Sequence, residues 1–542
     1  MNGTRPLGLR PWVKLAAAVV GLNVLLTFHN LWPTLWATPA PELSFELGIL
    51  LLVTVAWTAF VGPLGRKALV GLIVLVLALV LGRYAEVTAP ALYGRPINLY
   101  WDSQHLPKVA AMLADVGPWW LVGALVLGIV AVLAALVALI GWCLAAVSRS
   151  LRSAVGRRVV GAFGGMVVGV YVLSQVFAWP ARYHYALPVT ATYLQQVRFV
   201  FAAATADANR NLPSVPLPKS DFGRLEGDDV LLMFLESYGA VTYDEPAIAR
   251  VVAPARDELA HAAAETGRHV VSAYASSPTF GGGSWLAHAS FMSGVEVRDS
   301  GDYMLLLTQE RDTWAKQAKA AGYRAIAVMP GMKSAWPEGA FYGFDSILDE
   351  VALEYRGPDF GWWRIPDQFS LARVAQFESH DDSRRPLLTF FPTINTHIPF
   401  LPVPPYQADW QRVAEAEPYP PEDVIASLAP MPDWEALGGP YADSFVYTFT
   451  YLSGYLRQRP SADEILVLIG DHQPAASVAG VGARWDVPVH VITHRDDIAT
   501  ALLAAGFVEG VALAPLQRPI ATLPEISALL LETFAGEQAP SD

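Results

Sequence analysis

The chain has 542 residues, of which 53% are hydrophobic and only 16% are charged, and its mean hydropathy is +0.33. This hydropathy is too high for an ordinary soluble enzyme or a disordered chain, and the length is enough for several domains. The formal net charge of −13 argues against nucleic acid as the main partner, because phosphate binding requires concentrated Lys and Arg. The single cysteine, Cys143, excludes an intramolecular disulfide and a Cys-rich metal site. The composition therefore predicts a membrane protein with a large folded appendage.

Five apolar stretches near the amino terminus predict five transmembrane helices. They cover approximately residues 15–32, 47–65, 68–82, 119–147 and 159–181. The third stretch is short, because a helix needs roughly 20 residues to cross the hydrocarbon core. A cleaved signal peptide would account for the first stretch but not for the four that follow it. We therefore expect a five-helix membrane domain over residues 1–181.

The charges of the connecting loops predict the orientation of this domain. Basic residues precede the first stretch and join the second to the third and the fourth to the fifth: Arg5, Arg10, Lys14, Arg66, Lys67, Arg149, Arg152, Arg157 and Arg158. Residues 33–45, between the first two stretches, include no Lys or Arg. The positive-inside rule then places the N-terminus in the cytoplasm and, after five crossings, everything beyond Ala181 outside it. The Ala-, Arg- and Pro-rich composition indicates a GC-rich bacterium, and we therefore expect the spans to lie in a bacterial cytoplasmic (inner) membrane.

The remainder of the chain predicts an interfacial linker over residues 182–224 and an α/β domain over residues 225–542. The linker contains an amphipathic stretch near Thr190–Thr205 that could lie on the outer leaflet. In the α/β domain, short apolar runs alternate with polar helical stretches, which is typical of a mostly parallel sheet covered on both faces. The predicted strands cover residues 230–235, 269–275, 323–328, 387–391, 464–469 and 487–493, and the predicted helices include residues 248–266, 312–321 and 496–505.

Polar residues follow four of these strands. Glu236 follows the first strand, a Gly-rich turn into Ser284 follows the second, His397 follows the fourth, and Asp471 and His472 follow the fifth. Sites in open α/β sheets form beyond the carboxyl ends of the strands, so we expect these side chains to converge. A helix-capping role is the simpler explanation for any one acid taken alone. Four such strand ends in one sheet favour a functional site.

The residue types suit one divalent metal ion. Glu236, Asp471 and His472 offer two carboxylates and one imidazole, a set compatible with Mn²⁺ or Zn²⁺, with Mg²⁺ as a further alternative. The Ser284 hydroxyl would be the fourth ligand, and a bound cation lowers the pKa of a hydroxyl and makes it a nucleophile. If a helix begins at Ser284, its free N–H groups would favour a phosphoryl group. His397 could orient or protonate a leaving oxygen. A flexible loop with a capping serine and a packed loop histidine are the structural alternatives.

At these residues the chain resembles the lipoteichoic acid synthase family and the similar phosphoethanolamine transferases of the alkaline phosphatase superfamily. The resemblance depends on the five spans, the linker and four short motifs: Glu236-Ser, the Gly-rich turn into Ser284, Asn-Thr-His397-Ile-Pro-Phe and Gly-Asp471-His472. It implies an extracytoplasmic sulfatase-like domain in which Glu236, Ser284, Asp471 and His472 bind the metal, with His397 near the substrate phosphate.

The resemblance also implies a ping-pong reaction at the membrane. Ser284 would attack the head-group phosphodiester of a phospholipid donor, phosphatidylglycerol or phosphatidylethanolamine, and diacylglycerol would leave. The phospho-head group would then pass to an extracytoplasmic glycan or lipid acceptor. The chain departs from the family at two points: the nucleophile is usually threonine, and the Trp-x-Arg substrate pair is replaced by Trp336-Pro337-Glu338. Trp336 then carries over as a substrate-binding residue, and Arg364 could replace the missing arginine, with surface packing as the alternative.

Other members of the superfamily fit less well. A sulfatase needs a Cys/Ser-x-Pro-x-Arg motif, whereas Trp285 to His288 follow Ser284. A two-zinc site needs a second ligand set, and His288, His490 and His494 lack carboxylates in an evident pattern. Phosphoethanolamine transferases typically contain disulfides, so the absence of cysteine after Cys143 favours the lipoteichoic-acid-synthase-like branch. The alternatives to a transferase are a phosphodiesterase or phosphatase, and a catalytically silent lipid-binding regulator, against which the complete ligand set counts.

Overall fold

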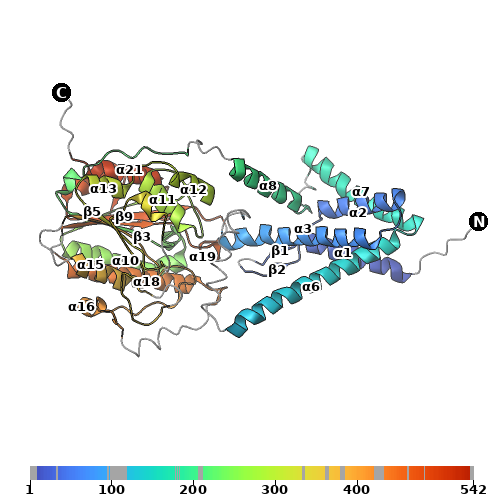
Figure 1. Cartoon of the computed structure of the whole chain (residues 1–542), viewed down its shortest axis with the longest axis horizontal. Coiled ribbons are helices and arrows are strands. Elements are labelled where there is room, and N and C mark those ends of the chain that lie inside the picture. Colours follow the sequence, from blue (N-terminus) through green and yellow to red (C-terminus); the bar gives the residue numbers. More distant parts are fainter. Residues whose placement is uncertain are drawn as a thin grey trace, which may run out of the picture. The chain divides into compact units, whose positions relative to one another are not determined.

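The computed structural model describes residues 9–31, 34–93, 97, 119–177, 179, 181, 184–205, 212–332, 336–360, 365–378, 385–419, 433–460, 463–480 and 482–536. The chain forms two compact units, residues 1–91 with 96–206 (unit 1) and residues 92–95 with 207–542 (unit 2). Unit 1 is helical, and unit 2 is an α/β domain (Figure 1).

Unit 1 consists of apolar helices and one short hairpin. Its elements are α1 (Leu9–Thr27), β1 (His29–Asn30), β2 (Ala37–Thr38), α2 (Phe45–Phe60), α3 (Arg66–Tyr93), α6 (Trp119–Ser150), α7 (Ala154–Val176) and α8 (Val189–Thr205). Four of these helices, α1, α3, α6 and α7, are long and apolar enough to cross a membrane, and α2 is a shorter apolar helix. All five predicted apolar stretches are therefore helical, and the amphipathic stretch before residue 206 forms α8.

The expectation that the third stretch is the short one is wrong. It belongs to the 28-residue helix α3, whereas the second stretch forms the 16-residue helix α2. Helix α3 continues past Arg83 because tertiary contacts satisfy this charge. The Arg83 Nε atom donates to the Phe28 carbonyl at 2.9 Å, and its Nη1 atom lies 3.3 Å from Glu86 Oε2.

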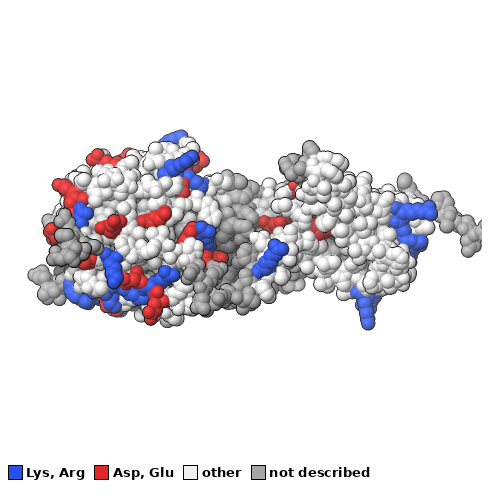
Figure 2. Space-filling view, turned by 90° about the horizontal axis from the view of Figure 1, so that it is seen from above, with Lys and Arg blue, Asp and Glu red and all other residues white. Residues whose placement is uncertain are grey.

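The surface of unit 1 is that of a multi-pass membrane protein. On α6, Leu127 is 71% exposed and Val132 is 61% exposed, whereas Cys143 packs into the buried core. Exposed apolar side chains along a long helix are stable in contact with lipid rather than water. Most of the visible face of unit 1 is uncharged, and Lys and Arg gather chiefly at one end of it (right side of Figure 2).

Unit 2 is built on a nine-stranded sheet with the order β10-β4-β9-β8-β3-β7-β5-β6, in which β11 also pairs with β4. The strands are β3 (Asp229–Leu235), β4 (His269–Ser276), β5 (Arg324–Val328), β6 (Ser346–Leu348), β7 (Leu387–Pro392), β8 (Glu464–Gly470), β9 (Asp486–Thr493), β10 (Val508–Glu509) and β11 (Ala521–Thr522). Each of the six predicted strands is present, and its ends lie within one residue of the predicted ends.

The sheet is mixed and mostly parallel, as expected. Strand β3 pairs in parallel with β7 and β8, and β5 pairs in parallel with β7 and β6. Strand β9 is reversed, because it pairs antiparallel with both β8 and β4. Two successive reversals leave β4 in the same direction as β3. The carboxyl ends of β3, β4, β7 and β8 therefore lie at one edge of the sheet, and these are the ends that carry the predicted site residues.

Helices cover both faces of this sheet (Figure 1). Helices α10 (Pro246–Glu265), α15 (Asp367–Glu378) and α18 (Gly438–Gln458) cover one face, and α11 (Ser284–Ser293), α13 (Trp314–Ala320), α20 (Asp496–Ala504) and α21 (Leu523–Phe534) cover the other. Alternate β3 residues enter the two cores, so Met233 packs in one and Phe234 in the other. Shorter helices are η3 (Gly223–Leu225), α9 (Val241–Asp244), α12 (Ser300–Leu307), α14 (Gly339–Tyr342), α16 (Trp410–Val413) and α19 (Ala476–Ala479).

Candidate metal and catalytic site

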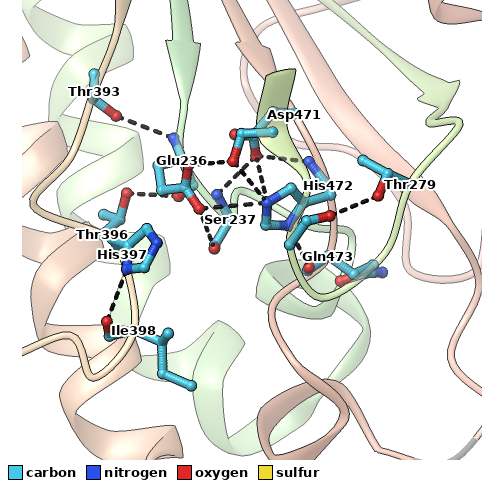
Figure 3. Close-up of polar contacts among 12 residues, drawn as sticks. Glu236, Ser237, Thr279, Thr393, Thr396, His397, Ile398, Asp471, His472 and Gln473 are labelled. Atoms are coloured by element: carbon cyan, nitrogen blue, oxygen red, sulfur yellow. Dashed lines mark hydrogen bonds and ion pairs between the residues drawn. The ribbon is translucent and has the colours of Figure 1, made fainter. Parts of the chain in front are cut away.

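Three predicted ligands lie together at the carboxyl edge of the sheet. Glu236, Asp471 and His472 are buried, and one ligand atom from each lies within 4.8 Å of the others. The parallel pairing of β3 and β8 explains this, because Leu235 lies opposite Gly470 and the next residue of each strand enters the site. Figure 3 shows the three side chains pointing toward one another.

Ser284 joins this cluster from the amino end of α11. Its Oγ atom donates to Glu236 Oε2 at 2.7 Å and lies 3.1 Å from His472 Nε2. Gly283 makes the turn that delivers the serine, with φ of +79°, and a Cβ there would lie 3.1 Å from Thr279 Oγ1. The backbone thus requires glycine at this position. The first N–H groups of a helix have no acceptor within the helix, which suits a phosphoryl group bound beside Ser284.

Ser237 supports both carboxylates. Its backbone N–H donates to Asp471 Oδ1 at 2.8 Å, and its Oγ atom donates to Glu236 Oε1 at 3.0 Å. Its φ of +58° is uncommon for a residue with a side chain, and the Tyr441 hydroxyl holds its carbonyl at 2.8 Å. In the sequence this serine is only the second residue of the Glu236-Ser motif, and no role is predicted for it there. The feature of the sequence that could have indicated a role for Ser237 is that a small polar residue directly follows the predicted ligand Glu236.

The segment after β7 frames Glu236 from the other side. Thr393 Oγ1 accepts a hydrogen bond from the Glu236 backbone N–H at 3.0 Å, and Thr396 Oγ1 donates to the Glu236 carbonyl at 2.5 Å. His397 follows directly, with Nδ1 2.8 Å from the Ile398 carbonyl (Figure 3). His397 therefore directly follows a residue that is hydrogen-bonded to the Glu236 backbone.

Asp367 fixes the position of this segment. Its carboxylate accepts the backbone N–H groups of Ile394 and Asn395, each at 2.9 Å, and its own N–H donates to Asn395 Oδ1 at 2.7 Å. Burial raises the pKa of Asp367 to about 7, although the two backbone donors favour the ionised form. No pattern in the sequence predicts a role for Asp367. The residue is the first of α15 and reaches the His397 segment only through the tertiary fold.

The pKa shifts of Glu236, Asp471 and His472 show that the cluster favours a positive charge between its two carboxylates. Burial opposes ionisation of Glu236, but the His472 charge outweighs burial and holds the pKa of Glu236 well below its usual range. Burial alone would lower the pKa of His472, but Asp471 and Glu236 raise it to about 9. Burial and then the Glu236 charge raise the pKa of Asp471. Two buried carboxylates this close are stable only with a cation between them.

The donor atoms fit a divalent metal ion. Asp471 Oδ2 is buried and has no hydrogen-bond partner among the described residues. His472 Nδ1 lies 2.7 Å from the Gln473 carbonyl and therefore carries a proton, which leaves Nε2 as the metal-binding atom facing Ser284. Two carboxylates, one imidazole and one hydroxyl form a ligand set suited to Zn²⁺ or Mn²⁺.

His288 also belongs to this site. It lies one helical turn after Ser284, its Nε2 atom is 3.7 Å from Asp471 Oδ2, and its ring packs 4.6 Å from that of Phe234. The structure therefore corrects the view that His288 lacks a carboxylate partner. The i, i+4 spacing from Ser284 on a helix was the available signal, because it places both side chains on one helical face.

The two other histidines considered for a second ligand set lie elsewhere. His490 is in the core of unit 2, with Nε2 2.9 Å from the Tyr238 hydroxyl and Nδ1 2.6 Å from Ser272 Oγ. His494 Nε2 lies 3.4 Å from Asp228 Oδ2, before the start of β3 and so at the opposite edge of the sheet. Arg495 already pairs with the same carboxylate at 2.5 Å.

Of the two residues predicted to bind the substrate, Trp336 is not tied to the cluster by direct contacts as the predicted ligands are. Trp336 is half-buried in an aromatic cluster, with its ring 5.4 Å from that of Tyr342 and 6.5 Å from that of Phe344. Phe344 stacks in turn on Phe390, whose ring contacts His288 at 5.7 Å. Trp336 thus reaches the site only through other aromatic side chains. Arg364 lies outside the described residues.

Solved structures similar to this chain include members of the alkaline phosphatase superfamily. A superfamily member from Vibrio parahaemolyticus has 16% identity and a TM-score of 0.35 over 62% of this chain and 74% of its own. Lipoteichoic acid synthase LtaP from Listeria monocytogenes has 13% identity and a TM-score of 0.35 over 60% and 76%. Lipooligosaccharide phosphoethanolamine transferase A (EptA) from Neisseria meningitidis has 11% identity and a TM-score of 0.44 over 90% and 87%.

The proteins named in this comparison include a lipoteichoic acid synthase and a phosphoethanolamine transferase, the two families that the sequence motifs resemble. No family model matches the chain. No curated protein matches it either. At identities of 11–16% and TM-scores of 0.35–0.44, these likenesses assign no reaction to this chain. The chemistry of the site has to follow from its own residues.

Proposed function

We propose that the protein is a metal-dependent transferase that moves a phospholipid head group, phosphoglycerol or a similar group, to an extracytoplasmic glycan or lipid. The observation that supports this most directly is the position of Ser284. Its hydroxyl lies 2.7 Å from Glu236 Oε2 and 3.1 Å from His472 Nε2 in a cluster that fits a divalent cation. A hydroxyl in such surroundings is the nucleophile of a two-step phosphoryl transfer.

In the first step Ser284 Oγ attacks the phosphorus of the donor head group. The Ser284 proton already points at Glu236 Oε2, which is the nearest acceptor. As the bond from Oγ to phosphorus forms, the bond from phosphorus to the diacylglycerol oxygen breaks, and His397 gives that oxygen a proton. In the second step an acceptor hydroxyl attacks the same phosphorus and gives its proton to His397. The bond from phosphorus to Ser284 Oγ breaks, and Ser284 Oγ leaves with the proton returned from Glu236 Oε2.

The residues that would hold the metal are Glu236, Ser284, Asp471 and His472. When bound, one Mn²⁺ or Zn²⁺ ion, or Mg²⁺ as the alternative, would supply a Lewis acid that lowers the pKa of the attacking hydroxyl. Ser237, His288 and the Gln473 carbonyl hold the ligands in place. Trp336 and Arg364 are the residues we assign to the head group.

The proposed donors are phosphatidylglycerol and phosphatidylethanolamine. Both present a phosphodiester at the membrane surface, which suits a chain whose unit 1 consists of apolar helices. We place the N-terminus in the cytoplasm and unit 2 outside the bacterial inner membrane, on the distribution of Lys and Arg among the loops.

The test is the intact mass of the purified full-length protein after incubation with Mn²⁺ and either lipid. We expect an adduct whose mass identifies the head group. Ser284→Ala should abolish the adduct, and Ser284→Thr should preserve it because the hydroxyl remains. The mechanism is wrong if Ser284→Ala still forms the adduct, or if the metal-loaded protein turns over either lipid without one. Release of the head group to water in the presence of acceptor would identify a phosphodiesterase instead.

A further inference from the structure

The turn that ends at His397 is bound to the end of β3. Residues 394–397 form this turn, in which the His397 backbone N–H donates to the Ile394 carbonyl at 3.0 Å. Thr396, the third residue of the turn, donates from Oγ1 to the Glu236 carbonyl at 2.5 Å (Figure 3). The turn therefore has one fixed contact with the candidate site. A single hydrogen bond would leave the turn free to rotate, so the position of His397 requires a second attachment.

Asp367, the first residue of α15, supplies that attachment. Its Oδ1 atom accepts the Ile394 N–H and its Oδ2 atom accepts the Asn395 N–H, each at 2.9 Å, and its own N–H donates to Asn395 Oδ1 at 2.7 Å. The next residue fixes α15 to a later part of the same loop, because Gln368 exchanges two hydrogen bonds with the backbone of Gln407 at 2.6 and 3.1 Å. Asp367 and Gln368 are both fully buried. Helix α15 therefore holds the first half of the turn with three hydrogen bonds that water does not reach.

Only an ionised carboxylate can make this attachment. Its two oxygens accept two separate backbone N–H groups, although burial raises the pKa of Asp367 to about 7 and so disfavours the ionised form. An asparagine in its place would keep one acceptor oxygen, but its amide nitrogen would face the second N–H donor. A buried charge that costs stability and fixes the geometry of a turn is typical of a functional site.

We propose that Asp367 is a positioning residue for the proton transfer by His397. The role rests on the proposed function, in which the diacylglycerol oxygen leaves phosphorus and takes a proton from His397. His397 Nδ1 lies 2.8 Å from the Ile398 carbonyl and therefore carries a proton, so Nε2 is the atom that gives the transferred proton to that oxygen. If His397 is displaced, the oxygen must leave as an alkoxide, which is a poor leaving group, and the step slows. Asp367 has no hydrogen bond to Ser284 or to the proposed metal ligands among the described residues, so their positions do not depend on it.

Two donors with the same head group and different leaving groups isolate this role. One is the phospholipid that the wild type uses, from which diacylglycerol leaves and needs a proton. The other is the 4-nitrophenyl diester of the same head group, from which 4-nitrophenolate leaves without a proton as its bond to phosphorus breaks. Both give the same adduct on Ser284. The rate of adduct formation is measured by intact mass on the full-length protein with Mn²⁺ at pH 8, where Asp367 with a pKa of about 7 is ionised.

The two donors should respond differently to the loss of the carboxylate. We expect Asp367→Asn to slow the reaction of the phospholipid about 10-fold to 100-fold and that of the nitrophenyl diester less than about threefold. Asp443→Asn, an exposed residue of α18, is the matched control and should change neither rate. An equal loss with both donors, or no loss with either, would overturn the proposal.

A double variant shows whether Asp367 acts through His397. His397→Ala should produce the same selective loss, and adding Asp367→Asn to it should slow the phospholipid reaction less than about twofold further. Multiplied losses in the double variant would contradict the proposal, because Asp367 would then act on another group.

Failure of this role can be distinguished from failure of the proposed function. A wild type that forms no adduct with either donor contradicts the proposed function itself, whereas a reactive wild type with an unselective Asp367→Asn variant contradicts only the positioning role. If Asp367→Asn does not fold, Asn395→Ala takes its place, because it removes only the acceptor of the Asp367 N–H. We then expect a smaller loss with the same selectivity for the phospholipid, and an equal effect on both donors would overturn the proposal.

Discussion

The backbone N–H of Ser237 donates to Oδ1 of Asp471 at 2.8 Å and so joins the second residue after the end of β3 to the first residue after the end of β8. The Oγ atom of the same serine binds Glu236 Oε1 at 3.0 Å. One residue therefore sets the spacing of the two carboxylates that would hold a metal. Its left-handed backbone, with φ of +58°, is the conformational cost of that arrangement.

The side-chain contribution of Ser237 can be separated from its backbone contribution. Ser237→Ala removes the bond to Glu236 but keeps the N–H that binds Asp471, so we expect metal affinity to fall roughly 10-fold to 100-fold with the fold intact. Titration of the metal-free full-length protein with Mn²⁺ against a chelator measures this. Ser293→Ala, at the far end of α11, is the control and should leave metal affinity unchanged. Unchanged affinity in Ser237→Ala would show that the backbone bond alone positions the ligands.

His288 is expected to orient Asp471. Its Nε2 atom lies 3.7 Å from Asp471 Oδ2, so replacing the imidazole removes the polar group nearest that oxygen. We expect His288→Phe, which preserves the packing against Phe234, to lower metal affinity and turnover about tenfold. His261→Phe is the matched control, because the His261 side chain is 74% exposed. If His288→Phe loses turnover but binds metal normally, His288 acts on the substrate rather than on the ligand.

The strands could be predicted closely because their sequence signal is local. Strands β3, β8 and β9 are buried along their whole length. Each begins with an acidic residue and continues as a mainly apolar run, interrupted in β9 by His490. The strand ends then pointed to Ser284 and to the cluster of Glu236, Asp471 and His472 that we propose as metal ligands. The reversal of β9 could not be predicted, because a strand buried on both faces has the same pattern in either direction.

Other features depend on contacts between distant residues. Helix α3 extends beyond Arg83 because the Phe28 carbonyl, 55 positions away, accepts a hydrogen bond from that side chain. The role of Asp367 depends on backbone donors 27 and 28 positions further along the chain. No local pattern contains such information. The chemistry of the site was therefore easier to predict than the residues that support it.

A side chain does not fit at position 470, directly before the proposed ligands Asp471 and His472. A Cβ at this position would lie 1.9 Å from the Tyr238 carbonyl oxygen and 2.9 Å from Val487 Cβ. Gly470→Ala must therefore push β8 away from the end of β3, and we expect a loss of about 1–3 kcal/mol in the free energy of unfolding together with weaker metal binding. Gly438→Ala is the control, since a Cβ there meets no atom within 4 Å. Thermal unfolding and the metal titration measure the two effects separately.

Removal of metal should destabilise unit 2. Burial, and then the Glu236 charge, raise the pKa of Asp471, so the two buried carboxylates repel each other when no cation lies between them. A chelator should therefore lower the melting temperature of the full-length protein, and added Mn²⁺ or Zn²⁺ should restore it in a concentration-dependent manner. Asp471→Asn removes one charge, so its melting temperature should respond much less to the chelator. An identical response in this variant would place the stabilising metal elsewhere.

His490 should make unit 2 sensitive to acid. Burial, and then the Arg256 charge, lower the pKa of His490 to about 3 from the ordinary value of 6.5. The unfolded chain therefore binds a proton between these pH values that the folded protein excludes. The stability that neutral His490 contributes to the folded protein is therefore complete above pH 6.5. As the pH falls toward 3, the free energy of unfolding decreases by up to about 1.4 kcal/mol per pH unit.

A substitution at this histidine separates its effect from that of the carboxylates. His490→Gln can still hydrogen-bond the Tyr238 hydroxyl and Ser272 Oγ but does not titrate. We expect it to be less stable than the wild type above pH 7, with a slope of unfolding free energy against pH that is shallower by about one proton between pH 4 and 6. Denaturant unfolding of the full-length protein in detergent, monitored at each pH, measures this slope. His261→Gln is the control and should keep the wild-type slope, because that side chain is mostly exposed. If His490→Gln also has the wild-type slope, His490 accepts its proton within the folded core and the prediction is wrong.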